Sequence, residues 1–264
     1  MTNFLKEIIN LKKKEVEALK VKRPITHFVD SKRLLKGVRS FREAISIANR
    51  VNLIAEIKSK SPSHKKGFSK KFDVARLAKI YADSGAAAIS VLTDKKYFGG
   101  NISHISEVRR VTDLPVLRKD FIIDEYQVYE SRYAGADAIL LIARILTKEE
   151  IKSFMYLAKR IGMECLVEVH DEKDLEKAII SDAKIIGINN RDLDTFKVNI
   201  DATFKLISKM PDQIIKVSES GIASDHDIAR LRDAGVNAVL IGGAFLGAKD
   251  IEGKIREVMG DDKG

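Results

Sequence analysis

The chain has few of the features that mark secreted, metal-bound or membrane proteins. Its 264 residues include one cysteine, Cys165, so no intramolecular disulfide can form, and this usage is typical of a reducing cytosol. The five histidines are scattered, and no Cys and His cluster has metal-ligand spacing. No apolar run reaches the length of a membrane span or a signal-peptide core. We therefore predict a cytoplasmic protein with no metal site and no membrane partner.

The charge is basic, +9 from 47 Lys and Arg against 38 Asp and Glu. Such a balance can indicate a nucleic-acid partner. Here the lysines are mixed with glutamates along amphipathic segments, and no basic block is interleaved with aromatics. The sequence therefore predicts no nucleic-acid partner, and an anionic small molecule suits the sign of the charge equally well.

Short β-branched runs alternate with amphipathic stretches from about residue 50 onward. We predict strands over residues 52–58, 87–92, 115–120, 137–143, 164–169, 184–189, 214–219 and 237–242. Three of the helical stretches between them end in a glycine, within SGAAA, AGADA and AGVNA, and these glycines are predicted helix stops.

This strict alternation predicts one α/β domain with a parallel sheet and helices outside it. Eight strands suit a (β/α)₈ TIM barrel of this length. A doubly wound open sheet is the competing fold, but it usually has a glycine-rich turn after its first strand, and SKSPSHKKG is not one.

Residues 1–49 do not follow the repeat. FLKEIINLKKKEVEAL has the apolar spacing of an amphipathic helix, and SFREAISIANR reads as a second helix before the first strand. We predict that residues 1–264 form a single barrel domain, with residues 1–49 as a helical extension packed on it.

Charged and polar side chains recur at the carboxyl ends of the predicted strands, where TIM barrels carry their catalytic groups. They are Glu56, Lys58, Lys119, Glu168, Asn189, Arg191 and Glu219. A single one could be a strand emerging into solvent, but a set on five strands indicates a shared site. Because side chains alternate along a strand, Lys119 shares a face with Leu117 and Phe121, opposite Arg118 and Asp120.

Glycines and small residues follow the last two predicted strands, in SESGIAS and LIGGAFLG. Backbone N–H groups in such turns can point at an anion, and the loops after strands seven and eight often hold phosphate in barrels. The sequence therefore predicts a phosphorylated substrate and a phosphate site at Ser220, Gly221, Gly242 and Gly243.

Motifs along nearly the whole chain resemble the indole-3-glycerol phosphate synthase family of tryptophan biosynthesis. They are IAEIKSKSPS, ISVLTDKKYFGG, LPVLRKDFIIDEYQ, ADAILLIARIL, CLVEVH, IGINNRDL, VSESGI and VLIGG. The resemblance implies a carboxy-lyase without a cofactor, and a chain of this length has no room for a second barrel, so we expect a single activity. It would convert 1-(2-carboxyphenylamino)-1-deoxyribulose 5-phosphate to indole-3-glycerol phosphate, and we expect it to be a monomer.

The resemblance also implies roles for individual residues. Lys119 resembles the general acid and Glu168 the carboxylate that serves proton transfers, while Lys58 would pair with the substrate carboxylate. Glu56, Asn189 and Glu219 would position these groups. Arg191 and Ser61 would contact the substrate, and Phe121 and Leu140 would pack against its aromatic ring. Ordinary loop roles are expected for His64 and His170.

Two alternatives stay open at this point. Phosphoribosylanthranilate isomerase, another phosphosugar barrel, would typically use a Cys–Asp pair, but Cys165 is on the wrong strand and is expected to face the helices. A noncatalytic barrel that binds phosphate or nucleic acid would need no lysine–glutamate constellation at its mouth.

Overall fold

The computed structural model of the protein describes residues 3–35, 37–60, 72–192 and 195–260. Its strands are β1 (Asn52–Ile57), β2 (Ala88–Leu92), β3 (Val116–Lys119), β4 (Ala138–Ile142), β5 (Glu164–Val169), β6 (Ile185–Asn189), β7 (Ile215–Glu219) and β8 (Ala238–Ile241). They form a closed barrel in sequence order, and the parallel pairing of β1 with β8 completes it. The predicted TIM barrel is confirmed, and every predicted strand agrees to within one residue at either end.

The barrel has two apolar layers, because alternate side chains of each strand point inward and outward. The inner layer includes Ile54, Leu117 and Leu166, and the outer layer contains their sequence neighbours such as Ala55 and Val167. Burial on both faces explains why these strands read as continuous hydrophobic runs rather than as an alternation.

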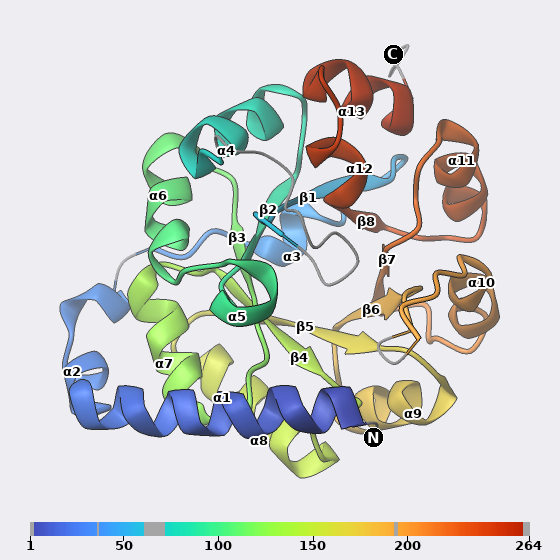
Figure 1. Ribbon diagram of the computed structural model, residues 1–264. Coiled ribbons are helices and arrows are strands. Elements are labelled where there is room, and N and C mark those ends of the chain that lie inside the picture. Colours follow the sequence, from blue (N-terminus) through green and yellow to red (C-terminus); the bar gives the residue numbers. More distant parts are fainter. Residues whose placement is uncertain (1–2, 36, 61–71, 193–194, 261–264) are drawn as a thin grey trace.

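Helices surround the barrel (Figure 1). The longer ones are α4 (Val74–Asp83), α6 (Ser103–Val111), α7 (Glu125–Ala134), α8 (Lys148–Arg160), α9 (Glu172–Ile180), α10 (Asp201–Ile207), α11 (Asp225–Asp233) and α13 (Ile251–Met259), and the short ones are α5 (Lys95–Phe98) and α12 (Gly243–Leu246). The predicted stops at Gly85, Gly135 and Gly235 all adopt positive φ, which glycine reaches without steric cost.

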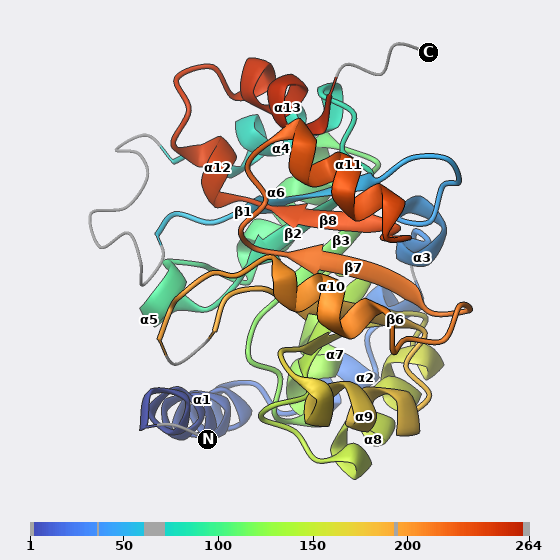
Figure 2. The ribbon, with the colours of Figure 1, turned by 90° about the vertical axis from the view of Figure 1, so that its right-hand side faces the viewer.

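The N-terminal segment contains α1 (Asn3–Lys22), α2 (Thr26–Val29), the 3₁₀ helix η1 (Lys32–Leu35) and α3 (Phe41–Ala44). Helix α1 lies at the same end of the barrel as α5, and α3 lies at the opposite end (Figure 2). Leu5 and Ile8 of α1 join the inner apolar layer, as do Phe41 and Ile45 from the other end.

The second helix expected in this segment is much shorter than its pattern suggests. Ser40 caps α3 by accepting a hydrogen bond from the backbone of Glu43, but the helix ends at Ala44. Asn49 has a φ of 64°, which a helix cannot contain, and this left-handed residue helps to turn the chain toward β1.

Candidate active site

A cavity of about 370 Å³ opens where the strands of the barrel end. Nearly all site residues predicted from the sequence line it: Glu56, Lys58, Lys119, Phe121, Leu140, Glu168, Asn189, Arg191, Glu219, Ser220, Gly221, Gly242 and Gly243. The remaining one, Ser61, lies outside the described residues, as does His64. Residues from strands far apart in the sequence therefore converge on one pocket.

Lys119 is at the centre of the charged groups in this cavity. Its Nζ lies 2.8 Å from Oε2 of Glu168 and 2.7 Å from Oε2 of Glu219. Burial would lower the pKa of Lys119, but the two carboxylates outweigh burial and raise that pKa above its usual value. Lys119 is therefore held as an ammonium group, with 13% of its side chain exposed at the pocket.

The two carboxylates differ although they share this lysine. Burial alone would raise the pKa of Glu168, but Lys119 and His170 outweigh it and hold that pKa below its usual range. Burial and the nearby charge of Glu168 prevail over Lys119 at Glu219, and they raise the pKa of Glu219 to about 7. One carboxylate is thus kept ionised, while the other can hold a proton near neutral pH. We call Lys119, Glu168 and Glu219 the mouth cluster.

Glu219 fits because Gly187 on the neighbouring strand β6 has no side chain. A Cβ at Gly187 would overlap Oε1 of Glu219. That oxygen is buried and has no hydrogen-bond partner among the described residues. The absence of a donor at Oε1 agrees with the raised pKa, because Lys119 stabilises a negative charge at Oε2 alone.

Glu56 and Lys58 at the end of β1 form an ion pair on one side of the cavity. The Glu56 side chain is almost fully buried, and Lys58 is more exposed. A Cβ at Gly242 would come within 2.7 Å of Oε1 of Glu56, so this glycine makes room for the carboxylate. Gly242 therefore has a packing reason to be glycine in addition to the role predicted for it.

Asn189 ends β6 and Arg191 follows it, and both line the cavity. The side chain of Asn189 accepts a hydrogen bond of 3.0 Å from the backbone N–H of Arg191. The Arg191 guanidinium donates to the carbonyl of Phe196 at 3.1 Å, and burial lowers its pKa from the usual value. Both side chains are fixed by their own loop and present polar groups to the cavity.

The loops after β7 and β8 form the wall of small residues. Ser220 and Gly221 both have positive φ, of 69° and 79°, so the chain turns sharply after β7. The buried side chain of Asn190 donates to the Ser220 carbonyl at 2.9 Å and fixes this turn. Asn190 is a supporting residue that the sequence analysis missed, although it stands within the NNRDL motif.

The apolar part of the wall includes residues that the sequence analysis did not assign to the site. Leu5 and Ile8 come from α1, and Phe98 lies with its ring centroid 6.4 Å from that of Phe121. The amphipathic pattern of α1 contained the signal that residues 5 and 8 would be buried. It could not indicate that the barrel mouth is the surface that buries them.

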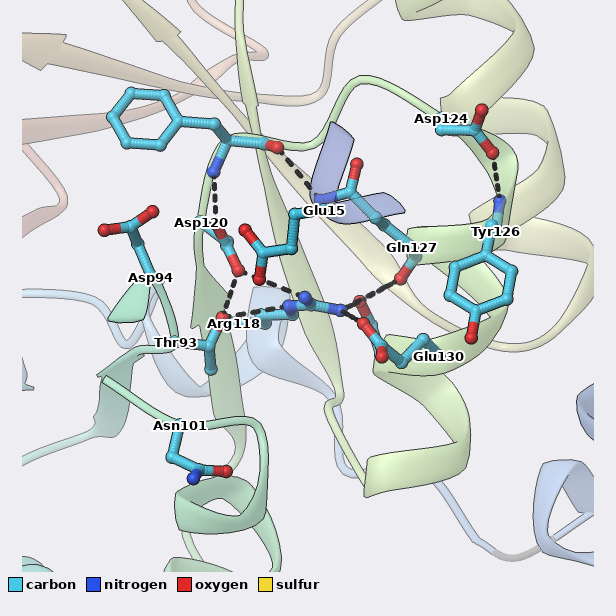
Figure 3. Close-up of polar contacts among 12 residues, drawn as sticks. Glu15, Thr93, Asp94, Asn101, Arg118, Asp120, Asp124, Tyr126, Gln127 and Glu130 are labelled. Atoms are coloured by element: carbon cyan, nitrogen blue, oxygen red, sulfur yellow. Dashed lines mark hydrogen bonds and ion pairs between the residues drawn. The ribbon is translucent and has the colours of Figure 1, made fainter. Parts of the chain in front are cut away.

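A second charged network lies on the other face of β3, between α1 and α7. Arg118 donates to Glu130 at 2.8 Å and to Asp120 at 3.1 Å (Figure 3). Lys12 of α1 lies 2.9 Å from Asp120 and 3.1 Å from Asp94. The predicted opposition of Lys119 to Arg118 and Asp120 is confirmed. We call Lys12, Arg118, Asp120 and Glu130 the outer cluster.

Cys165 faces the helices, where it packs against the outer apolar layer, and burial raises the pKa of its thiol. It is therefore not placed to act with the groups of the cavity. Among residues 3–35, 37–60, 72–192 and 195–260, no group of His, Cys, Asp and Glu could hold a metal ion. No helix in the same ranges is long and apolar enough to cross a bilayer.

A closed barrel whose charged groups converge at the carboxyl ends of its strands defines the class of this protein, a (β/α)₈-barrel enzyme. Solved structures support the fold. 3-Hexulose-6-phosphate synthase from Salmonella typhimurium matches with a TM-score of 0.63 at 15% identity, over 79% of this chain and 97% of that one. Thiamine phosphate pyrophosphorylase from Pyrococcus furiosus matches with a TM-score of 0.59 at 16% identity, over 80% and 94% of the two chains.

Sequence comparison then identifies the family. The model of the indole-3-glycerol phosphate synthase family matches residues 5–258. Synthases of this name are 52% identical in Acetivibrio thermocellus, over 78% of this chain and 79% of that one, and 45% identical in Desulforamulus reducens, over 97% of both. The chain belongs to the indole-3-glycerol phosphate synthase family, carboxy-lyases of tryptophan biosynthesis that act on a phosphorylated small molecule. This decides against the isomerase and the noncatalytic barrel.

Proposed function

We propose that the mouth cluster carries out the ring closure, decarboxylation and dehydration of 1-(2-carboxyphenylamino)-1-deoxyribulose 5-phosphate. The products are indole-3-glycerol phosphate, carbon dioxide and water. The observation that supports this most directly is the position of Lys119, which is kept protonated between two carboxylates and still reaches the cavity. No cofactor is needed for these steps, because the ring system itself accepts the electrons left by carbon dioxide.

Lys119 is the general acid in this proposal. It donates a proton to the ketone oxygen while the aromatic carbon that bears the carboxylate attacks the ketone carbon. The developing alkoxide then becomes a hydroxyl group, and the cationic ring intermediate lies among carboxylates that stabilise it. Loss of carbon dioxide restores a neutral ring.

Glu168 is the group that accepts the proton during dehydration. Its lowered pKa keeps it ionised at neutral pH, as a base must be. The hydroxyl group then leaves as water when it receives a proton from an acid of the cluster. Glu219 is positioned against Lys119 by the space over Gly187, and it helps to hold the ammonium group toward the substrate.

The other residues bind and orient the substrate. Lys58 neutralises the aromatic carboxylate and Glu56 positions Lys58, with which it is paired. Asn189, Arg191 and Ser61 contact the polar parts, while the aromatic ring lies against Phe121 and Leu140. Backbone N–H groups at Ser220, Gly221, Gly242 and Gly243 hold the phosphate, which supplies binding energy remote from the reacting carbons.

The test is formation of indole-3-glycerol phosphate, followed by its ultraviolet absorbance without added metal and with a chelator present. We expect turnover by the wild type and a loss of about 10²–10⁴-fold in kcat for Lys119→Ala, the usual contribution of a general acid. Lys152→Ala is the matched control, because Lys152 is an exposed lysine of α8. An active Lys119→Ala would move the acid to Lys58, and an inactive but folded wild type would refute the proposal.

We also propose that the enzyme is a cytoplasmic monomer with no nucleic-acid partner, a single domain in which residues 1–49 extend the barrel. Support for the domain organisation comes from Leu5, Ile8 and Phe41, which are buried in the same apolar cluster as the barrel strands. The single cysteine fits a reducing compartment. Light scattering after size exclusion tests the oligomeric state.

A further inference from the structure

His170 is the first residue after β5, two positions beyond Glu168, so the two side chains point the same way. The sequence suggests an ordinary loop role for it. In the structure only 3% of the His170 side chain is exposed, and the ring does not line the cavity. A buried titratable ring directly behind a reacting carboxylate requires an explanation.

The two ring nitrogens of His170 face two carboxylates. Nε2 lies 3.3 Å from Oε1 of Glu168, and Nδ1 lies 3.7 Å from Oδ2 of Asp174. Neither nitrogen makes a hydrogen bond of standard geometry with any described residue, Glu168 and Asp174 included. The two carboxylates are thus the ion-pair neighbours of the ring nitrogens, and each can accept a hydrogen bond from the ring after a small adjustment of its orientation.

Asp174 is itself held firmly in the first turn of α9. Its Oδ2 accepts from Nε of Arg144 at 3.3 Å and from the backbone N–H of His170 at 3.3 Å. Burial would raise the pKa of Asp174, but the His170 ring and Arg144 outweigh burial and hold that pKa below its usual range. Lys177 also lies 3.6 Å from Oδ1. The carboxylate on this side of the ring is therefore fixed in place.

Glu168 therefore has a nitrogen near each oxygen, Nζ of Lys119 at 2.8 Å from Oε2 and Nε2 of His170 at 3.3 Å from Oε1. Glu219 shares the same lysine but has no partner at its second oxygen among the described residues. His170 is thus a charged-group contact that Glu168 has and Glu219 lacks, beside the hydrogen bond that the Asn189 side chain gives to Glu168. The charged groups that face the ring are Glu168 and Asp174, with Arg144 and Lys177 behind Asp174 and Lys119 beyond Glu168.

We propose that His170, braced by Asp174, is a positioning residue that fixes the Glu168 carboxylate opposite Lys119 and so makes Glu168 the proton acceptor of the mouth cluster. This inference rests on the role proposed above for Glu168. The ring acts through that carboxylate and makes no contact with the substrate. It orients one oxygen while the other remains available to Lys119 and the reacting proton.

Two amide variants separate the contacts of the ring. The amide nitrogen of Gln in His170→Gln can occupy the place of Nε2 and donate to Glu168, whereas that of Asn in His170→Asn reaches only the place of Nδ1, toward Asp174. We expect His170→Gln to keep kcat within a few-fold of the wild type. We expect His170→Asn to lose about 10–100-fold in kcat with little change in KM, the range typical when the group that orients a reacting side chain is removed.

The pH profile of kcat gives a readout that a merely structural role would not move. Without the His170 contact the pKa of Glu168 rises, so the acidic limb of the profile should move to higher pH in His170→Asn and stay in place in His170→Gln. Asp174→Asn keeps the His170 ring but removes the negative charge that faces Nδ1. It should move the acidic limb of the pH profile in the same direction, by less than His170→Asn does. It also keeps the test open should His170→Asn fail to fold, which circular dichroism would detect.

Glu168→Gln is assayed beside these variants as a benchmark. Suppose that Glu168→Gln is inactive while His170→Gln and His170→Asn show equal losses and equal pH profiles. That result would overturn the role of His170 and leave the proposed base in place. An unshifted acidic limb in Asp174→Asn and His170→Asn would do the same. An active Glu168→Gln would overturn the proposed base and this inference with it.

Discussion

Two buried ion-pair networks lie on opposite faces of β3, and their side chains come from consecutive residues. The outer cluster pairs Arg118 with Asp120 and Glu130, while Thr93 and Ser131 contribute further hydrogen bonds to the guanidinium. The mouth cluster pairs Lys119 with two carboxylates but leaves Oε1 of Glu219 without a partner and part of Lys119 exposed. Both networks border a cavity, but of the two only the mouth cluster has a buried side-chain oxygen without a partner among the described residues.

With the role proposed for the mouth cluster, this difference separates charges that stabilise the fold from charges that take part in the reaction. A buried ion pair recovers its desolvation cost only when its remaining donors and acceptors are also satisfied, as they are around Arg118. A functional site, by contrast, keeps donors or acceptors that no protein group has paired. The unpaired Oε1 and the raised pKa of Glu219 mark such a site. Each network should therefore respond to mutation in its own way.

The largest effect on stability is expected from the outer cluster. Arg118→Met leaves the buried Glu130 without the cation it pairs with and leaves Asp120 with Lys12 alone, and breaking a buried pair in this way typically costs about 3–5 kcal/mol. Urea unfolding measures this loss, and Arg110→Met on the exposed side of α6 is the control. If Arg118→Met were as stable as the control, the outer cluster would not be a stabilising network.

A smaller effect, which depends on pH, is expected from Glu219. Its pKa of about 7 in the folded protein exceeds the ordinary value of 4.5, so the folded state holds a proton that the unfolded chain releases. The favourable contribution of that proton is complete below pH 4.5 and is lost as the pH rises toward 7, with a total on the order of 3 kcal/mol.

Urea unfolding of the wild type and Glu219→Gln between pH 5 and 8 tests this sign. The stability of the wild type should fall relative to that of Glu219→Gln as the pH rises, because the amide cannot ionise. A stability difference that is constant with pH would show that Glu219 does not change its ionisation on folding.

The smallest effect is expected from the space beneath Glu219. Gly187→Ala places a Cβ against Oε1 of Glu219, and overpacking of this kind usually costs about 1–3 kcal/mol. The carboxylate can move only by disturbing Lys119, so kcat should fall as well. Gly247→Ala is the matched control, since its Cβ would have its nearest neighbour at 3.8 Å and its φ is −84°. Equal kcat values in both variants would show that Glu219 has room to shift.

Much of the barrel could be predicted because its signals are local. The eight apolar runs and the glycines at 85, 135 and 235 mark where strands begin and helices end, and short-range sterics govern both. The predicted strand ends also brought charged residues together, since the ends of parallel strands share one rim of a barrel. The side-chain alternation that separates Lys119 from Arg118 follows from the same local geometry.

Other features arise only from the three-dimensional arrangement. The pattern of α1 indicated that Leu5 and Ile8 would be buried, but only the fold shows that they close the barrel mouth. Glu168 and Glu219 are both carboxylates at strand ends and look alike in the sequence. Their pKa values move in opposite directions because Lys119, His170 and Asn189 outweigh burial at Glu168, whereas burial and the charge of Glu168 prevail at Glu219. Local patterns thus indicate which groups reach the site, whereas their ionisation depends on burial and on through-space partners that come together only in the folded chain.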